Sequence, residues 1–231
     1  MSVHDGHRER LKSRFLREGL NGFDDHMVLE ILLFYTIPRI DTNPLAHVLL
    51  KRFGSLAAVF DAPYEELLKV KGIGPKTASM IKLIPSVCRS YLISRCDVGR
   101  ILTNTKDIGE FIIPYFFGET DEVIYLICLD GKNKVLDCSE MGRGSVDNVG
   151  INVRKIVEQA MSFNAVSVII AHNHPGGLAV PSYDDLIASQ KLKNGLAGVD
   201  ILLIDHIIVA DGDFVSLNES MLLNYEKFEK V

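Results

Sequence analysis

The residues best suited to chemistry are two histidines, a serine and an aspartate within AHNHPGGLAVPSYDD, residues 171–185. His172 and His174 end an apolar, β-branched run, and side chains two residues apart share one face of a strand. A Pro-Gly-Gly turn then leads to Ser182 and Asp185. Two imidazoles and one carboxylate leave one position of a tetrahedral zinc site open for water, as in catalytic sites. The segment predicts one Zn²⁺ ion held by His172, His174 and Asp185.

Each part of this segment also has a structural interpretation. A single histidine at a strand end is more often a hydrogen-bonded structural residue than a metal ligand. The pattern S-x-x-D is a common helix start, with Ser182 as the N-cap and Asp185 in the first turn. That cap is compatible with a ligand role for Asp185. Asp184 would point about 100° away around the helix, which makes Asp185 the better ligand. Two histidines, a turn and a carboxylate together favour the metal site.

Strand and helix patterns alternate around this segment, as expected for an α/β domain. Apolar, β-branched runs predict strands, and periodic apolar residues predict helices. The predicted strands cover residues 122–130, 134–141, 165–172 and two parts of 200–217, and the predicted helices cover 151–163 and 182–196. The core face predicted for the first of these helices comprises Val153, Ile156, Val157, Ala160 and Met161.

The amino-terminal part of the chain has a different pattern and a different charge. Apolar residues recur at three- and four-residue spacing through residues 8–60, which predicts helices only. Residues 1–100 carry a net charge of +4, whereas residues 101–231 carry −9. These changes predict two domains, residues 1–98 and 102–231, with different partners.

Composition restricts the location of the protein. No window approaches the roughly 18 consecutive apolar residues that a transmembrane helix needs. The charged start of the chain lacks the apolar region of a secretory signal. The four cysteines form no C-x-x-C pair and have no disulfide-like spacing. We therefore expect a cytoplasmic protein with reduced thiols.

Residues 64–84 have the glycine pattern of a helix–hairpin–helix in LLKVKGIGPKTASMI. Gly72 and Gly74 would let the backbone approach a phosphate group, next to the free N–H groups of a helix start. Lys71 and Lys76 would add phosphate contacts that carry no sequence information. The hairpin predicts DNA binding, and packing or protein contact is the alternative that the sequence leaves open.

The order H-x-H, seven residues, then S-x-x-D is the signature of the JAB/MPN (JAMM) metalloproteases. The longer form HNHPGG followed by PS and D resembles the RadC family. The resemblance extends through EMGRGS and IDHIIVADGDFVSL, and through GHRERLKSRFL and KGIGPKTA near the amino terminus, so that it spans nearly the whole chain. It implies an all-α helix–hairpin–helix domain followed by an α/β MPN domain. The MPN domain would have a cytidine-deaminase-like mixed sheet flanked by helices.

The resemblance also implies roles for individual residues. Glu140 in SEMGRGS would be the general base that takes a proton from the attacking water, and Ser182 would hydrogen-bond the developing oxyanion. From the sequence alone, Glu140 would instead be a solvent-facing residue at a strand end. His206 is expected to have a structural or second-shell role, since a third histidine ligand would close the open position. Many relatives have other residues where this chain has Ser139 and Gly176, but neither is an implied ligand.

Three functions follow from these observations. The complete ligand set favours a zinc-dependent peptidase or isopeptidase that acts on a peptide or isopeptide substrate. The alternative is a non-catalytic DNA-binding or scaffold protein in DNA repair or recombination. A nucleotide-directed zinc hydrolase is a third option, although the missing P-C-x-x-C pair argues against deamination. A second copy of the chain or another protein partner is also open.

Overall fold

The structure is a computed structural model that describes residues 3–38, 40–96, 98–144 and 151–223. The chain divides into two compact units, Met1–Cys88 and Arg89–Val231. The division falls inside helix α6 (Pro75–Ser94), before the boundary predicted from the sequence. The last turns of α6 belong to the second unit because Ile93 packs against its core and Arg89 pairs with Glu119.

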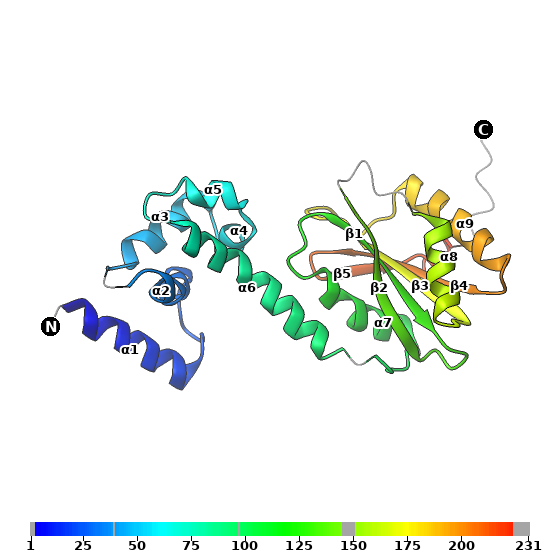
Figure 1. Cartoon of the computed structure of the whole chain (residues 1–231), viewed down its shortest axis with the longest axis horizontal. Helices are drawn as coiled ribbons and strands as arrows, with labels where there is room; N and C mark the ends of the chain where they lie inside the picture. The colour runs from blue at the N-terminus through cyan, green and yellow to red at the C-terminus, as the bar shows by residue number, and fades with distance from the viewer. Residues whose placement is uncertain (1–2, 39, 97, 145–150, 224–231) are drawn as a thin grey trace. The chain divides into compact units, whose positions relative to one another are not determined.

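The described part of the first unit is built from helices, as predicted (Figure 1). Before α6 these are α1 (Val3–Glu18), α2 (Asp25–Thr36), α3 (Asn43–Phe53), α4 (Leu56–Asp61) and α5 (Tyr64–Leu68). Apolar residues from α2 to α6 meet in one core, which includes Leu29, Leu33, Leu49, Val59, Leu67 and Ala78. The helical periodicity in the sequence therefore corresponds to packed faces of short helices.

The second unit contains a five-stranded mixed sheet in the order β2-β1-β3-β4-β5. Its strands are β1 (Glu122–Leu129), β2 (Val135–Gly144), β3 (Ser167–Asn173), β4 (Leu202–Ala210) and β5 (Asp213–Ser216). Its helices are α7 (Thr105–Ile112), the 3₁₀ helix η1 (Ile113–Phe116), α8 (Val153–Ser162) and α9 (Tyr183–Ala197). The strands β3 and β4 are parallel, and the other neighbouring pairs are antiparallel. The predicted strands are confirmed, and so are the two predicted helices, which correspond to α8 and α9.

Both faces of the sheet are covered by helices (Figure 1). On one face, Leu126 and Ile170 pack in the same core as residues of α8 and α9. On the other face, Ile127 and Ile169 pack against α7 and η1. This alternation of neighbouring residues is the period of two that a strand imposes on its side chains. Burial on both faces explains the apolar sequence of β1 after Glu122 and of β3 between Ser167 and His172.

The predicted core face of α8 is confirmed in part. Its residues Ile156 and Ala160 are buried, and Val153 and Val157 pack against them. Met161 is 55% exposed, so its predicted place in the core is wrong. One residue corresponds to a rotation of about 100° in a helix, which takes Met161 past the face that Ala160 occupies.

The crossover between the parallel strands positions the candidate site. A parallel connection needs a crossover segment, and α9 provides it between β3 and β4. Residues 174–182 join the end of β3 to the first turn of α9. Side chains of both elements therefore lie near the carboxyl end of β3. Among the described helices there is none with the length and hydropathy to span a lipid bilayer.

Candidate metal centre

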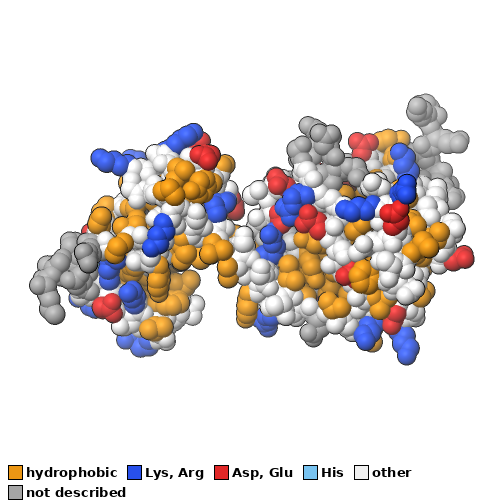
Figure 2. Space-filling model, viewed as in Figure 1, with side chains coloured by type: hydrophobic (Ala, Val, Ile, Leu, Met, Phe, Trp, Pro, Cys, Tyr) orange, Lys and Arg blue, Asp and Glu red, His pale blue; other side chains and the backbone are white. Residues whose placement is uncertain are grey.

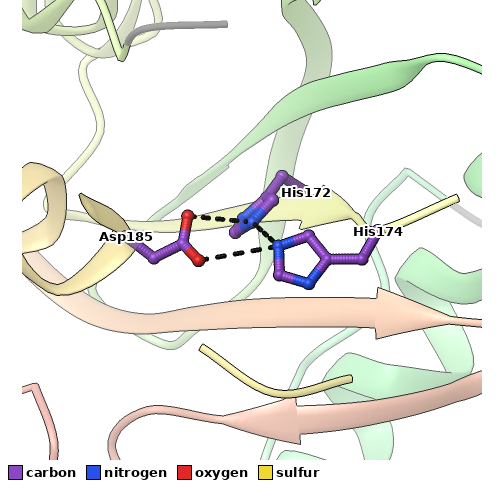
Figure 3. Close-up of side chains that lie close together, drawn as sticks. All are labelled: His172, His174 and Asp185. Carbon is purple, nitrogen blue, oxygen red and sulfur yellow. Dashed lines mark hydrogen bonds and ion pairs between the residues drawn. The ribbon is translucent and has the colours of Figure 1, made fainter. Parts of the chain in front are cut away.

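The two predicted histidine ligands lie at the carboxyl end of β3 (Figure 3). His172 belongs to β3 and is 7% exposed, and His174 follows the strand directly. The backbone N–H of His174 donates to Val209 of β4, which continues the parallel pairing beyond the strand end. The Nε2 atoms of the two rings lie 2.9 Å apart. The i, i+2 spacing therefore brings the two imidazoles together, as predicted.

Asp185 enters from the first turn of α9 through a capping box. The Ser182 hydroxyl accepts from the Asp185 backbone N–H at 3.2 Å. In return, Oδ2 of Asp185 accepts from the Ser182 backbone N–H at 2.7 Å and from its hydroxyl at 2.6 Å. The predicted N-cap is confirmed, and the same contacts hold the Asp185 carboxylate in place.

The ligand atoms of these three residues converge on one point (Figure 3). His172 Nε2 lies 3.1 Å from Oδ1 of Asp185, and His174 Nε2 lies 3.5 Å from Oδ2. Tetrahedral zinc with bonds of roughly 2.0–2.1 Å would place its ligand atoms about 3.3 Å apart. Two imidazoles and one carboxylate at this spacing fit a divalent metal ion of the zinc type and could hold one.

Burial and hydrogen bonding determine the charge state of the cluster. Burial raises the pKa of Asp185, but the hydrogen bond and charge of His172 and the hydrogen bonds from Ser182 outweigh it and hold that pKa well below its usual range. Burial lowers the pKa of His206 well below 6.5, and the charge of His172 lowers it further. Near neutral pH Asp185 is therefore an ionised carboxylate, and the buried imidazole of His206, beside the cluster, is neutral.

Two buried residues lie behind His172. Its Nδ1 atom lies 2.8 Å from Nε2 of His206 on β4. The other ring nitrogen of His206, Nδ1, lies 2.5 Å from the hydroxyl of Ser189 on α9. His206 therefore contacts the candidate ligand His172 and is absent from the group of converging ligand atoms. Ser189 was not anticipated, because a serine within a helix carries no signal of such a contact.

A cavity of about 130 Å³ opens next to the cluster. It has apolar and acidic walls formed by Glu122, Ile124, Ile151, His172, Asp184, Asp185, Ala188 and His206. Glu122 begins β1, two residues before Ile124, and therefore shares its face of the sheet. The side chain of Asn173 fixes the backbone on both sides of Glu122, accepting from Val123 N–H at 2.7 Å and donating to Asp121 O at 3.0 Å.

A family model described as the RadC-like JAB domain matches residues 102–222, which include the whole cluster. The chain belongs to the RadC family. A UPF0758 protein of Fusobacterium nucleatum subsp. nucleatum is 34% identical over 227 residues, which cover 95% of this chain and 98% of the relative. A UPF0758 protein of Nitrosococcus oceani is 34% identical over 221 residues, which cover 96% and 97%. Both matches extend over the two units of this RadC protein.

In this RadC chain, Glu140 is not brought to the candidate metal ligands. It lies directly opposite Tyr125 in the β1–β2 pairing and so shares its face of the sheet. Consistently, burial and then the charge of Glu140 raise the pKa of Tyr125. His172 lies opposite Ile124, whose side chain belongs to the other face. Glu140 instead pairs with Arg143 at 2.9 Å, whereas Glu122, which sequence reasoning missed, lines the cavity.

The hairpin of the RadC chain lies between α5 and α6, and a helix-hairpin-helix motif model matches residues 34–83. Gly72 has φ of +100°, a conformation that L side chains rarely adopt, which explains the glycine at this position. Gly74 accepts the first backbone hydrogen bonds of α6. Lys71 and Lys76 are exposed on either side of the turn. The four predicted hairpin residues therefore occupy one turn with an open backbone and two exposed cations.

Proposed function

We propose that the second unit is a zinc-dependent hydrolase that cleaves peptide or isopeptide bonds. The observation that carries this proposal is the convergence of two imidazole nitrogens and a carboxylate next to a cavity with a further carboxylate, Glu122. When bound, zinc supplies a Lewis acid and makes water a nucleophile near neutral pH. His172, His174 and Asp185 would hold the ion, and the cavity would admit water and the scissile bond.

Hydrolysis also needs a group that moves a proton from the attacking water to the leaving amine. Glu122 is placed for this task because its side chain lines the cavity beside His172 and Asp185. Asn173 fixes the backbone before and after Glu122, which limits the positions that its carboxylate can reach. We therefore propose Glu122 as the general base in this chain, and Glu140 stays a prediction from the resemblance.

Ser182 was predicted to stabilise the developing oxyanion. Its hydroxyl hydrogen is directed to Oδ2 of Asp185 in the structure. A serine has a single hydroxyl hydrogen, so a role at the oxyanion requires that this bond be exchanged during the reaction. This hydrogen bond supports a different contribution, which is to orient the carboxylate of Asp185.

Two libraries would test the proposed reaction on zinc-loaded protein, one of fluorogenic peptides and one of lysine ε-linked isopeptides. The wild type should hydrolyse members of at least one library, and Glu122→Gln should lose that activity by a factor of about 10² or more with zinc content unchanged. Glu140→Gln is the matched control and should retain activity. Loss in Glu140→Gln alone would assign the base to Glu140, and no hydrolysis by zinc-loaded wild type would contradict the proposed reaction.

A second function is supported by the first unit, and we propose that its hairpin binds the DNA backbone. Gly74 has open space around it, Gly72 is exposed, and Lys71 and Lys76 flank the turn as exposed cations. Lys and Arg side chains are spread over the visible face of this unit with few acidic groups among them, whereas the second unit shows both charges mixed (Figure 2). Such contacts would bind DNA of any sequence and weaken with salt.

A further inference from the structure

We propose that His206 and Ser189 position the ligand His172 by fixing the hydrogen bond at the ring nitrogen that does not face the metal. This inference rests on the proposed metal site. It concerns three contacts in a row: His172 Nδ1 to His206 Nε2 at 2.8 Å, His206 Nδ1 to Ser189 Oγ at 2.5 Å, and Ser189 Oγ to the backbone oxygen of Asp185 at 2.6 Å.

The last contact sets the direction of all three hydrogen bonds. A backbone carbonyl can only accept, so the Ser189 hydroxyl must donate to Asp185 O. The Ser189 oxygen is then free to accept from Nδ1–H of His206. A neutral His206 with its proton on Nδ1 has a lone pair on Nε2, which accepts from Nδ1–H of His172. This donor order places a proton on Nδ1 of His172, so that Nε2 of the neutral ring carries the lone pair that a metal ligand requires.

The fold buries this chain of hydrogen bonds from His172 through His206 and Ser189 to the Asp185 backbone, which we call the relay. In the parallel pairing of β3 and β4, Ile170 lies opposite His206, so that His206 shares the face of His172. Ser189 follows Asp185 by four residues, one turn along α9. His206 is fully buried and Ser189 is 2% exposed. The relay therefore begins at one ligand and ends on the backbone of another, with its two middle residues closed to solvent.

The relay also accounts for why a third histidine beside the cluster does not become a third nitrogen ligand. Both ring nitrogens of His206 are engaged, one by His172 and the other by Ser189. Neither nitrogen is left to enter the coordination sphere, so the position that faces the cavity stays available to water or substrate. A hydrogen-bond partner behind a ligating histidine usually fixes its tautomer and orientation, and its loss costs about 10–100-fold in metal affinity.

Ring-nitrogen NMR of the zinc-loaded full chain tests the donor order. His206 should carry its proton on Nδ1 alone, and the Nδ1–H of His172 should show the downfield shift of a hydrogen-bonded donor. Protonation of His206 on Nε2 would overturn the relay, because two N–H groups cannot bond to each other. A wild type that binds no zinc would refute the metal site and the relay together.

Zinc affinity of two variants tests the consequence. His206→Leu removes the acceptor and should weaken zinc binding about 10–100-fold, whereas the side-chain oxygen of His206→Gln can accept from His172 Nδ1–H and should keep affinity within about 3-fold of wild type. Urea unfolding of the metal-free proteins separates binding from folding. Wild-type affinity in His206→Leu, or equal weakening in both variants, would overturn the positioning role while leaving the metal site intact.

Discussion

Replacement of Ser182 by alanine separates two contributions of one side chain. The hydroxyl caps α9 by accepting from the Asp185 N–H, and it donates to the Asp185 carboxylate at 2.6 Å. Loss of an N-cap costs about 1 kcal/mol. The second bond reaches a charged group, but Ser182 is exposed, so we assign it about 0.5 kcal/mol. Ser182→Ala should therefore lower the free energy of unfolding by about 1.5 kcal/mol.

The matched control is Asn152→Ala, which removes the cap of α8, where the side chain accepts from Lys155 N at 3.1 Å. It should cost about 1 kcal/mol as well, without touching a ligand. Zinc affinity discriminates between the two, because the Ser182 hydroxyl orients Asp185. We expect about 10-fold weaker binding for Ser182→Ala and no change for Asn152→Ala, measured with a competing chelator. Equal zinc affinities in the two variants would refute the reasoning.

Three further predictions concern packing, pH and DNA. In Gly109→Ala the new Cβ would lie 2.2 Å from the Phe214 ring, so urea unfolding should show a free energy of unfolding lower by about 2 kcal/mol. Gly131→Ala, with open space around it, should leave that free energy unchanged, and equal effects of the two changes would contradict the predicted clash. Burial raises the pKa of the Cys128 thiol from 9.0 to about 12, so the folded state keeps a proton that the unfolded chain releases, and stability is lost as pH rises. Between pH 8 and pH 10 the wild type should lose about 1.4 kcal/mol more than Cys128→Val, and parallel curves would show that Cys128 contributes nothing. Lys76→Glu should weaken DNA binding in fluorescence anisotropy and reduce the slope of log affinity against log salt concentration by about 1. Arg17→Glu, outside residues 34–83 of the matched motif, should do neither, and equal effects of the two changes would indicate that only overall charge matters.

The convergence of the candidate ligands could be predicted because it depends on local geometry alone. His172 and His174 share a face by strand alternation, and Ser182 and Asp185 meet through a capping box whose spacing is fixed by the helix. The sequence also placed the strands and α8 and α9 correctly. Each of these features is decided by residues close together in the chain, so that periodicity is sufficient to identify them.

Features that depend on strand pairing could not be predicted. Glu122 lies in the cavity because Ile124 pairs with His172, and Glu140 lies on the other face because it pairs with Tyr125 next to a register shift in β2. Ser189 meets His206 only because α9 packs on the face of β4 that carries this histidine. The helix α7 was not predicted, since its eight residues include Gly109 and its single apolar face is too short for a clear period.

The metal content of purified protein, measured by plasma mass spectrometry after zinc is supplied, tests directly whether His172, His174 and Asp185 bind zinc. We expect one zinc ion per wild-type chain, lost in His174→Ala and in Asp185→Ala. Asp184→Ala is the control, since Asp184 lines the cavity without belonging to the group of converging ligand atoms, and it should retain zinc. A wild type without zinc, or ligand variants that keep it, would contradict the proposed zinc site.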